Sequence, residues 1–203
     1  YRKTWMQVNL DKIERNLIKL KNICQKKVIA VLKADAYGCG DIHVARAVLE
    51  AGAEMIAVSS LDEALVLRNE GYEDKLLILG ATEASDIPVL IKQGISCTAF
   101  SNEWVDSAIQ QNCEGLHVHL KMDTGMSRIG FRTIDELHLA FNKLQAANCD
   151  MEGIFTHFCC ADSDLELTNL QFAKFKEAVE SFSYSFPWVH CDNSDATAFF
   201  KED

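Results

Sequence analysis

The chain has 203 residues, 48% of them hydrophobic, and 20 basic against 30 acidic residues give a formal net charge of −10. This is enough apolar material for one well-cored domain, and the acidic balance argues against a nucleic-acid partner, whose phosphates would be repelled. No apolar run approaches the ~20 residues of a membrane span, and the start lacks the apolar core of a signal peptide, so we expect no membrane partner and a cytoplasmic location.

Short apolar segments rich in β-branched residues recur along the chain, with helix-like stretches between them. We predict strands at 28–34, 55–60, 75–80, 96–100, 116–123, 151–158 and 188–194. Most are apolar on both faces, as expected of parallel strands covered on each side. Ser60–Glu63 and Thr133–Glu136 have the capping-box pattern of a helix start, and Gly71 and Gly94 follow helical segments as C-caps.

This alternation predicts an α/β protein with right-handed parallel crossovers. An open doubly wound sheet and a (β/α)8 TIM-type barrel both fit. We favour the barrel because polar residues recur at strand ends all along the chain, whereas an open sheet concentrates ligand contacts at one switch point. A barrel has eight strands, and the chain ends soon after the seventh, so we expect a barrel that lacks the eighth strand. No linker divides residues 1–203, which we interpret as one domain.

The first strand ends in a lysine. In the alternation of "VIAVLKA", Lys33 shares a face with Ile29 and Val31, which predicts that it points into apolar packing. A lysine desolvated in this way has a lowered pKa, and its neutral amine can form a Schiff base. The alternative is a lysine whose ammonium group reaches solvent at the strand end.

The fifth strand carries a polar stripe. His117, His119, Lys121 and Asp123 share one face, which is costly in a central strand unless the groups are paired; a solvent-facing edge strand is the alternative. "DTGMSRIGF" follows, with glycines on both sides of Arg128. At the mouth formed by the strand ends, its guanidinium group could bind a carboxylate or phosphate with two hydrogen bonds.

The last two strands end in further polar groups. "THF" brings His157 to the end of the sixth strand, although a lone histidine is more often simply packed. "HCDNSDA" brings Asn193 and Ser194 to the end of the seventh, where they could bind phosphate or cap an ordinary turn.

Eight cysteines are many for this length, but none form a C-x-x-C pair. Zinc ligands usually come in such close pairs, so we expect no metal site. A chain this apolar does not need disulfides. We expect most of the cysteines to be small buried hydrophobic residues.

Together these motifs resemble those of the N-terminal barrel of the alanine racemase family, whose members use pyridoxal phosphate. "VLKADAYGCG" is similar to the family's V-K-A-N-A-Y-G-H-G, with Asp35 and Cys39 where the family has asparagine and histidine. "KMDTGMSRIGF" is similar to K-x-D-T-G-M-x-R-x-G-F, and "THF" and "NSDA" follow in matching order and spacing. The resemblance covers essentially the whole chain.

The resemblance implies a role for each candidate residue. Lys33 would bind the cofactor as an internal aldimine and act as the base on the D-amino-acid side. Tyr37 would lie near the cofactor and help hold its phosphate, and Arg128 would contact its phenolic oxygen and the substrate carboxylate. Lys121 matches a position that is often carbamylated, which would give Arg128 an anionic partner. Contacts to the cofactor ring and to its phosphate would come from His157, Asn193 and Ser194.

The implied function is the interconversion of L- and D-alanine through a pyridoxal-phosphate aldimine with two bases, one on each face, which would supply D-alanine for peptidoglycan. In the family, the second base is a tyrosine of a C-terminal β domain in the other subunit of a homodimer. None of the four tyrosines lies in a matching motif. We therefore expect that domain to be absent from this chain, and the 203 residues alone not to racemise efficiently.

Two alternatives remain open at this point. A serine racemase of the vancomycin-resistance type shares the barrel, and a non-catalytic pyridoxal-phosphate carrier has a similar length and fold. "KMDTGMSRIGF" argues against the carrier, because a carboxylate-binding arginine beside a carbamylated lysine has no evident use there.

Overall fold

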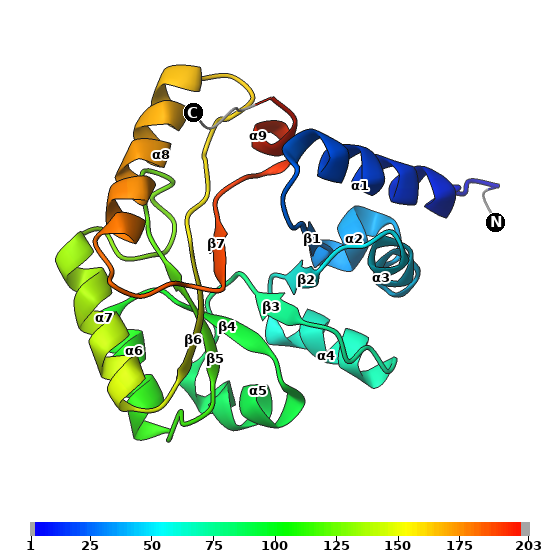
Figure 1. Cartoon of the computed structure of the whole chain (residues 1–203). Helices are drawn as coiled ribbons and strands as arrows, with labels where there is room; N and C mark the ends of the chain where they lie inside the picture. The colour runs from blue at the N-terminus through cyan, green and yellow to red at the C-terminus, as the bar shows by residue number, and fades with distance from the viewer. Residues whose placement is uncertain (1–2, 200–203) are drawn as a thin grey trace.

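The computed structural model describes residues 3–199, which form a curled parallel sheet with helices on its outer side (Figure 1). The sheet has seven strands in the order β1 to β7. They are β1 Ile29–Val31, β2 Met55–Val58, β3 Leu76–Ile78, β4 Ser96–Ala99, β5 His117–Lys121, β6 Asp150–Phe155 and β7 Trp188–His190. Because each strand pairs with its neighbours in the sequence and no reversal occurs, the sheet is of the barrel type, as predicted, and the doubly wound alternative is wrong.

Helices precede the first strand, connect successive strands and follow the last strand. They are α1 Leu10–Cys24, α2 Lys33–Gly38, α3 Asp41–Glu50, α4 Leu61–Asn69, the 3-10 turn η1 Ala84–Asp86, α5 Ile87–Gln93, α6 Asn102–Gln110, α7 Ile134–Ala146, α8 Leu165–Glu180 and α9 Ser194–Phe199. Thr133 and Glu136 form the predicted capping box of α7, and Gly94 ends α5 in the left-handed conformation. The sequence signals therefore located several helix ends correctly.

Most of the apolar core lies between the sheet and its helices. A second, small cluster of Met55, Ala57, Leu77 and Trp188 packs together on the other face of the strands. Polar residues of β5 and β6 are buried as well. The inner side of the curl therefore combines a few apolar side chains with a polar network, described below.

The strands are shorter than predicted at their carboxyl ends. β1 ends at Val31 rather than at residue 34, and β6 ends at Phe155 rather than at 158. Lys121 still closes β5, whereas Lys33, His157 and Asn193, which we also placed on strands, come after their strands have ended, at the mouth of the curled sheet. This is the end at which barrel enzymes bind their ligands.

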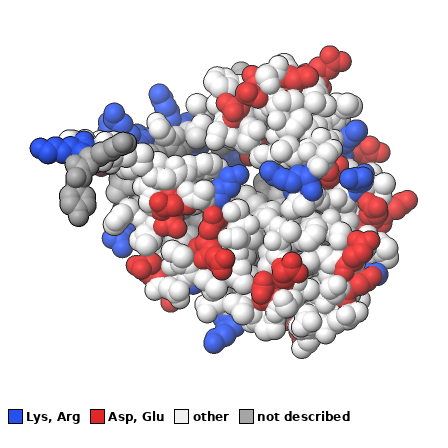
Figure 2. Space-filling model, turned by 180° about the vertical axis from the view of Figure 1, so that it is seen from behind, with Lys and Arg blue, Asp and Glu red and all other residues white. Residues whose placement is uncertain are grey.

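Charged side chains are scattered over the outside of the molecule (Figure 2). Acidic side chains are spread over the whole face shown in Figure 2 rather than gathered in one patch. Within residues 3–199, no helix has both the length and the apolar character needed to cross a membrane.

The cysteines differ from the prediction. Cys97, Cys113, Cys149 and Cys191 are buried, whereas Cys24, Cys39 and Cys160 are partly exposed and Cys159 is exposed. The expectation that most of them are buried is therefore wrong for half of the set. Within residues 3–199, no disulfide bond joins any two of the eight.

Candidate active site

Lys33 follows β1 at the start of a left-handed turn. Residues Ala34 to Tyr37 all have φ between 50° and 56°, a conformation that costs roughly 1–2 kcal/mol for each L-residue. Lys33 is half-buried, as Ile29 and Val31 are, so the alternating burial of the strand continues to this residue although β1 itself ends at Val31. Strained backbone of this kind concentrates at functional sites.

Glu63 of α4 holds the beginning of this turn. Its carboxylate accepts hydrogen bonds from the N–H of Ala34 (2.7 Å) and from the N–H and hydroxyl of Ser59 (2.7 and 2.8 Å). Burial acts to raise the pKa of Glu63, but these hydrogen bonds outweigh it and lower the pKa below the usual value. The sequence pattern identified Glu63 only as a capping residue, so its contact with the lysine turn was missed.

Tyr37 lies at the other end of the turn. The Lys33 Nζ atom is 5.8 Å from the centre of the Tyr37 ring, within the range of a cation–π contact. The Tyr37 side chain is 65% exposed. A lysine and an aromatic ring therefore lie side by side at the mouth, with the ring open to a ligand.

Lys121, the last residue of β5, is 1% exposed, and its Nζ atom has no hydrogen-bond partner within the described part of the chain. The atom lies 5.1 Å from the centre of the Phe155 ring. Burial, supported by the positive charge of Arg128, lowers the pKa of Lys121 to about 8. A buried amine without a partner is an incomplete site, because such a group normally has one.

His157 lies on the loop after β6, and the charges of three cations act on it. Burial lowers the pKa of His157 to about 4, and three positive charges act in the same direction. These charges belong to Lys33, Lys121 and Arg128. The charges of residues from three separate motifs thus act on one histidine, and His157 is neutral at pH 7.

A tight loop presents Arg128. The Asp123 carboxylate accepts hydrogen bonds from the N–H groups of Gly125 (3.1 Å) and Ser127 (2.9 Å). A Cβ atom at Gly130 would lie 2.8 Å from both the Asp123 nitrogen and the Lys121 oxygen, so only glycine fits there. The loop thus folds back against the end of β5, and the Arg128 side chain remains exposed.

Asn193 and Ser194 are placed differently from the candidate residues above. The Asn193 side-chain oxygen accepts a hydrogen bond from the Ala196 N–H (2.9 Å), and its amide group donates to the Phe158 carbonyl (3.4 Å). Asn193 therefore caps α9 and ties it to the loop after β6. Ser194 is exposed on the first turn of α9.

A buried polar network that the sequence analysis did not foresee lies below the mouth. His119 contacts Glu152 (Nε2 to Oε2, 3.3 Å) and His190 (Nδ1 to Nε2, 3.0 Å). Glu152 also accepts hydrogen bonds from Lys75 (2.6 Å) and Ser96 (2.5 Å). The stripe on β5 is thus largely paired, because His117 contacts Asp150 at 2.8 Å. The edge-strand alternative is wrong, since β5 lies between β4 and β6.

The protonation of this network follows from its burial. Hydrogen bonds from His119, Lys75 and Ser96 outweigh the effect of burial and hold the pKa of Glu152 well below its usual value. Burial lowers the pKa of both histidines, so they are neutral at pH 7. An ionised Glu152 can only accept hydrogen bonds, so His119 donates to it from Nε2. The unprotonated Nδ1 of the neutral His119 then accepts a hydrogen bond from Nε2 of His190. Because His190 is also neutral, its own Nδ1 carries no proton.

Gln171 of α8 joins the two loops that carry Arg128 and His157. It is fully buried. Its amide nitrogen lies within donating distance of the Thr124 hydroxyl (3.2 Å) and the His157 carbonyl (3.4 Å), and its oxygen accepts from the Cys159 N–H (3.1 Å). No pattern in the sequence pointed to this glutamine, because it lies inside a helix far along the chain from both motifs.

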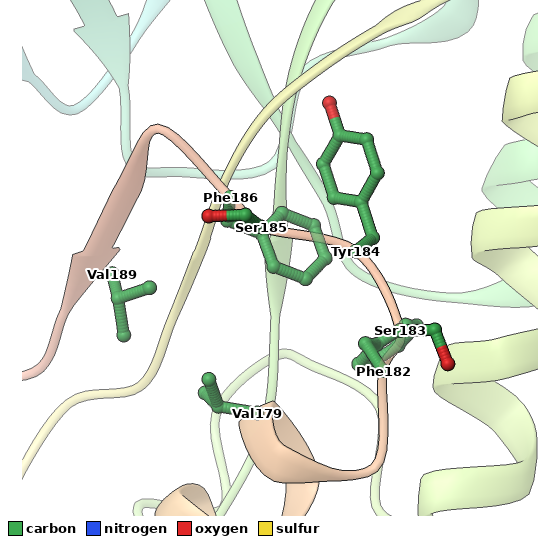
Figure 3. Close-up of a pocket in the computed structure, with 7 residues that line it drawn as sticks. All are labelled: Val179, Phe182, Ser183, Tyr184, Ser185, Phe186 and Val189. Carbon is green, nitrogen blue, oxygen red and sulfur yellow. The ribbon is translucent and has the colours of Figure 1, made fainter.

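Other features do not mark a competing site. Figure 3 shows a shallow depression lined mainly by Phe182, Tyr184 and Phe186, on the segment that enters β7. This segment precedes the strand, at the end opposite to the mouth. Among residues 3–199, no group of three or more His, Cys, Asp or Glu side chains is arranged to hold a metal ion.

Comparison with known proteins agrees with this geometry. The family model "Alanine racemase, N-terminal domain" matches residues 8–203. The chain is 39% identical over its whole length to alanine racemase 1 of Oceanobacillus iheyensis and 38% identical to alanine racemase of Geobacillus stearothermophilus, covering 56% and 54% of those proteins. It therefore spans about half the length of these relatives.

Solved structures show the same likeness. The crystal structure of alanine racemase from Bacillus anthracis with bound L-Ala-P matches with a TM-score of 0.89 and 37% identity, covering 97% of this chain and 53% of that one. Histidine racemase from Leuconostoc mesenteroides matches with a TM-score of 0.89 and 26% identity, covering 94% of this chain and 53% of that one. With the family model matching almost the whole sequence, the chain belongs to the alanine racemase N-terminal domain family.

Proposed function

We propose that this chain is the pyridoxal-phosphate-binding part of an amino-acid racemase that interconverts L- and D-alanine. The observation that carries the proposal is the cluster of Lys33, Lys121 and Arg128 around a neutral His157. Lys33 and Arg128 bring positive charge to this mouth whether or not Lys121 is carbamylated, and positive charge suits a ligand with several negative charges. The relatives at 38–39% identity are alanine racemases, which favours alanine over the serine-racemase and carrier alternatives.

The residues present fit pyridoxal phosphate. Lys33 would hold it through its amine, and Tyr37 would offer the exposed ring beside that amine. Arg128 would contact its phenolic oxygen, and the remaining contacts would come from His157 at the ring and from Asn193 and Ser194 near the phosphate. When bound, the cofactor makes the α-proton of an attached amino acid acidic, because its conjugated ring delocalises the electron pair.

The side chains of this chain then have distinct tasks. The Lys33 amine would take the α-proton from one face of the substrate, and in the reverse direction of the reaction it would deliver a proton to that same face. The Arg128 guanidinium group orients the substrate carboxylate. His157 stays neutral because of its lowered pKa, so it adds no further positive charge next to the reacting centre. A second base on the opposite face, from the partner subunit of a cytoplasmic homodimer, completes the exchange in this proposal.

Lys121 is proposed to carry a carbamate. Its pKa of about 8 makes the neutral amine far more abundant near pH 7 than that of an ordinary lysine. The amine nitrogen bonds to the carbon of carbon dioxide and releases a proton, so the group becomes an anion. This anion would neutralise the charge of Arg128 and fix its orientation. Carbamylation would also explain why the buried Lys121 nitrogen has no hydrogen-bond partner among the described residues.

The substrate side chain is the least constrained part of the proposal. Histidine racemase has the same fold with a TM-score of 0.89, so the fold alone does not select alanine. The identity to alanine racemases, which is higher, supports the small substrate. Activity with L-serine and L-histidine should therefore be measured beside L-alanine.

The test uses the full-length protein with pyridoxal phosphate. L-Alanine is incubated in D2O, and the formation of D-alanine and the exchange of the α-proton are followed by chiral chromatography and NMR. We expect Lys33→Ala to reduce racemisation by at least ~10³-fold and to abolish the visible absorbance of the lysine-bound cofactor. Lys19→Ala, at an exposed position of α1, is the matched control. Absence of D-alanine with the wild type, or normal turnover with Lys33→Ala, contradicts the proposal.

A further inference from the structure

Two adjacent cysteines lie at the mouth, on the loop between β6 and α8. The Sγ atoms of Cys159 and Cys160 are 3.3 Å apart. Cys159 is exposed, Cys160 is partly exposed, and both are free thiols. The pair begins only two residues after His157 and has no part in the proposed racemase chemistry.

The distance between the sulfur atoms decides which ligand they suit. A disulfide requires ~2.05 Å between sulfurs and Cα atoms ~4.4–6.8 Å apart, whereas Cα atoms of adjacent residues are ~3.8 Å apart. A disulfide here would therefore be strained. A soft metal ion with linear coordination and bonds near ~2.3 Å would hold the sulfurs ~4.6 Å apart. A pyramidal centre with similar bonds near a right angle spans about 3.3 Å, which matches the pair.

The protonation of Cys160 points in the same direction. The hydrogen bond with Cys159 raises the pKa of Cys160 to about 11, and the negative charges of Asp164 and Asp162 contribute less in the same direction. Thiolates are the reactive form toward oxidants and alkylating agents, so Cys160 is a poor target for both. A reagent that takes up two thiol protons and releases water suits it better.

We propose that Cys159 and Cys160 form a two-thiol binding site for monosubstituted trivalent arsenicals. With an arsenical of the form R–As=O, two As–S bonds form and two S–H bonds break. The oxygen leaves with both protons as one water molecule. Arsenic remains trivalent, and no group is oxidised or reduced.

A second cysteine pair provides an internal control. Cys113 and Cys149 also have sulfur atoms 3.3 Å apart, but they are only 1% and 9% exposed within the core. The core is close-packed, so an arsenical with an organic group cannot reach them in the folded protein. Accessibility, rather than sulfur distance alone, makes Cys159 and Cys160 the site.

Occupation of the site reaches the candidate active centre through Gln171. The Cys159 thiol lies 3.3 Å from the Gln171 oxygen, which also accepts the Cys159 N–H. Gln171 in turn contacts the His157 carbonyl. Arsenic removes the thiol proton and places an organic group beside this contact, so we expect racemisation to fall; this part rests on the proposed function.

The experiment uses the full-length protein and phenylarsine oxide at one equivalent. Intact-protein mass spectrometry should show one adduct on the wild type, removed by a 1,2-dithiol but not by a monothiol at the same thiol concentration. Cys159→Ser and Cys160→Ser should each retain the arsenical ~100-fold more weakly, because a single thiol loses the second bond. Cys113→Ser should bind as the wild type does. Circular dichroism establishes that each variant is folded.

Each outcome decides one part of the inference. No adduct on the folded wild type, or an undiminished adduct on Cys159→Ser and Cys160→Ser, overturns the site. An adduct without any fall in racemisation overturns only the coupling through Gln171. Failure of the proposed function is separate, since it appears as absence of racemisation before any arsenical is added.

Discussion

At the scale of single residues, Lys121 makes a measurable contribution to the pH dependence of stability. Its pKa is lowered to about 8 in the folded protein by burial and by the charge of Arg128, against an ordinary value of 10.5. Between these two values the unfolded chain binds a proton that the folded chain does not. The free energy of unfolding therefore increases as the pH rises from about 8 to 10.5, and this gain disappears when the pH is lowered to 8.

We predict that Lys121→Met removes this pH dependence. In carbon-dioxide-free buffer, the wild type should gain roughly 2–3 kcal/mol from Lys121 between about pH 8 and 10.5, whereas Lys121→Met should lack that gain. The measurement is urea unfolding at both ends of the window. Lys19→Met, at an exposed site of α1, should keep the wild-type slope, and the same slope in Lys121→Met would contradict the assignment.

The sequence motifs could predict which residues lie near the strand ends, but not which residues support them. The sequence motifs located Lys33, Arg128 and His157, which the structure brings together. Glu63 and Gln171 were missed, because each acts through a tertiary contact with a loop distant in sequence. Such contacts leave no periodic signal in one sequence, whereas a polar residue in an apolar strand, such as Glu152, is a signal that could have been used.

At the scale of elements, the turn after β1 is the largest departure from expectation. Among these residues only Asp is enriched at positive φ, and then at single positions, whereas Ala and Tyr rarely adopt it, so nothing in "KADAYG" predicts four successive left-handed residues. The conformation is held by tertiary hydrogen bonds, including that from the Ala34 N–H to Glu63. The turn is therefore strained locally and stabilised by its surroundings.

We predict that Ala34→Gly stabilises the protein by about 0.5–1 kcal/mol. Glycine adopts this conformation without the steric cost, and this gain is partly offset because glycine has greater conformational entropy in the unfolded chain. Ala34 is exposed, so no packing is lost. Ala173→Gly, at an exposed site inside α8, is the matched control and should destabilise by about 1 kcal/mol. Urea unfolding measures both, and equal destabilisation by the two changes would argue against the left-handed turn.

The network between β5 and β6 is a second element-scale feature. A register shift between Val118 and His119 places Gly153 opposite His119, where a Cβ atom would overlap the His119 ring. Regular alternation cannot foresee such a bulge. It brings Glu152 within reach of His119, and that pairing explains how β5 bears a polar stripe in the middle of the sheet.

We predict that Glu152→Gln destabilises the protein by about 2–3 kcal/mol, because it removes a buried charge that accepts three hydrogen bonds. Lys75→Gln should cost less than about 1 kcal/mol, since the Lys75 side chain is 54% exposed. Thermal unfolding near pH 7 compares the two. The loss of stability in Glu152→Gln relative to the wild type should shrink below the usual carboxyl pKa of about 4.5, where the unfolded wild-type chain takes up a proton. A loss that stays constant with pH would contradict an ionised Glu152.

At the scale of the whole molecule, the order of the strands was predictable because it follows the order of the sequence. Strand–helix alternation with polar strand ends predicted the barrel topology that the structure has. The way in which the two ends of the described chain meet was not predictable. α1, which precedes the sheet, packs on α3 and on α9, the last described helix (Figure 1). In the described residues, β1 and β7 are the edges of the sheet, so α1 links the elements at these two edges.

This arrangement predicts a specific long-range effect of the α1 core residue Leu17, which is 6% exposed. Leu17→Ala should cost about 2–4 kcal/mol through lost burial and the cavity left behind, and it should weaken the docking of α9. Amide hydrogen exchange should then show faster exchange in α9 than in α7, which lies elsewhere on the sheet. Ile18→Ala changes the neighbouring side chain, which is 47% exposed, and should leave both helices protected. If α9 keeps its protection in a destabilised Leu17→Ala, then α1 does not hold the two edges together.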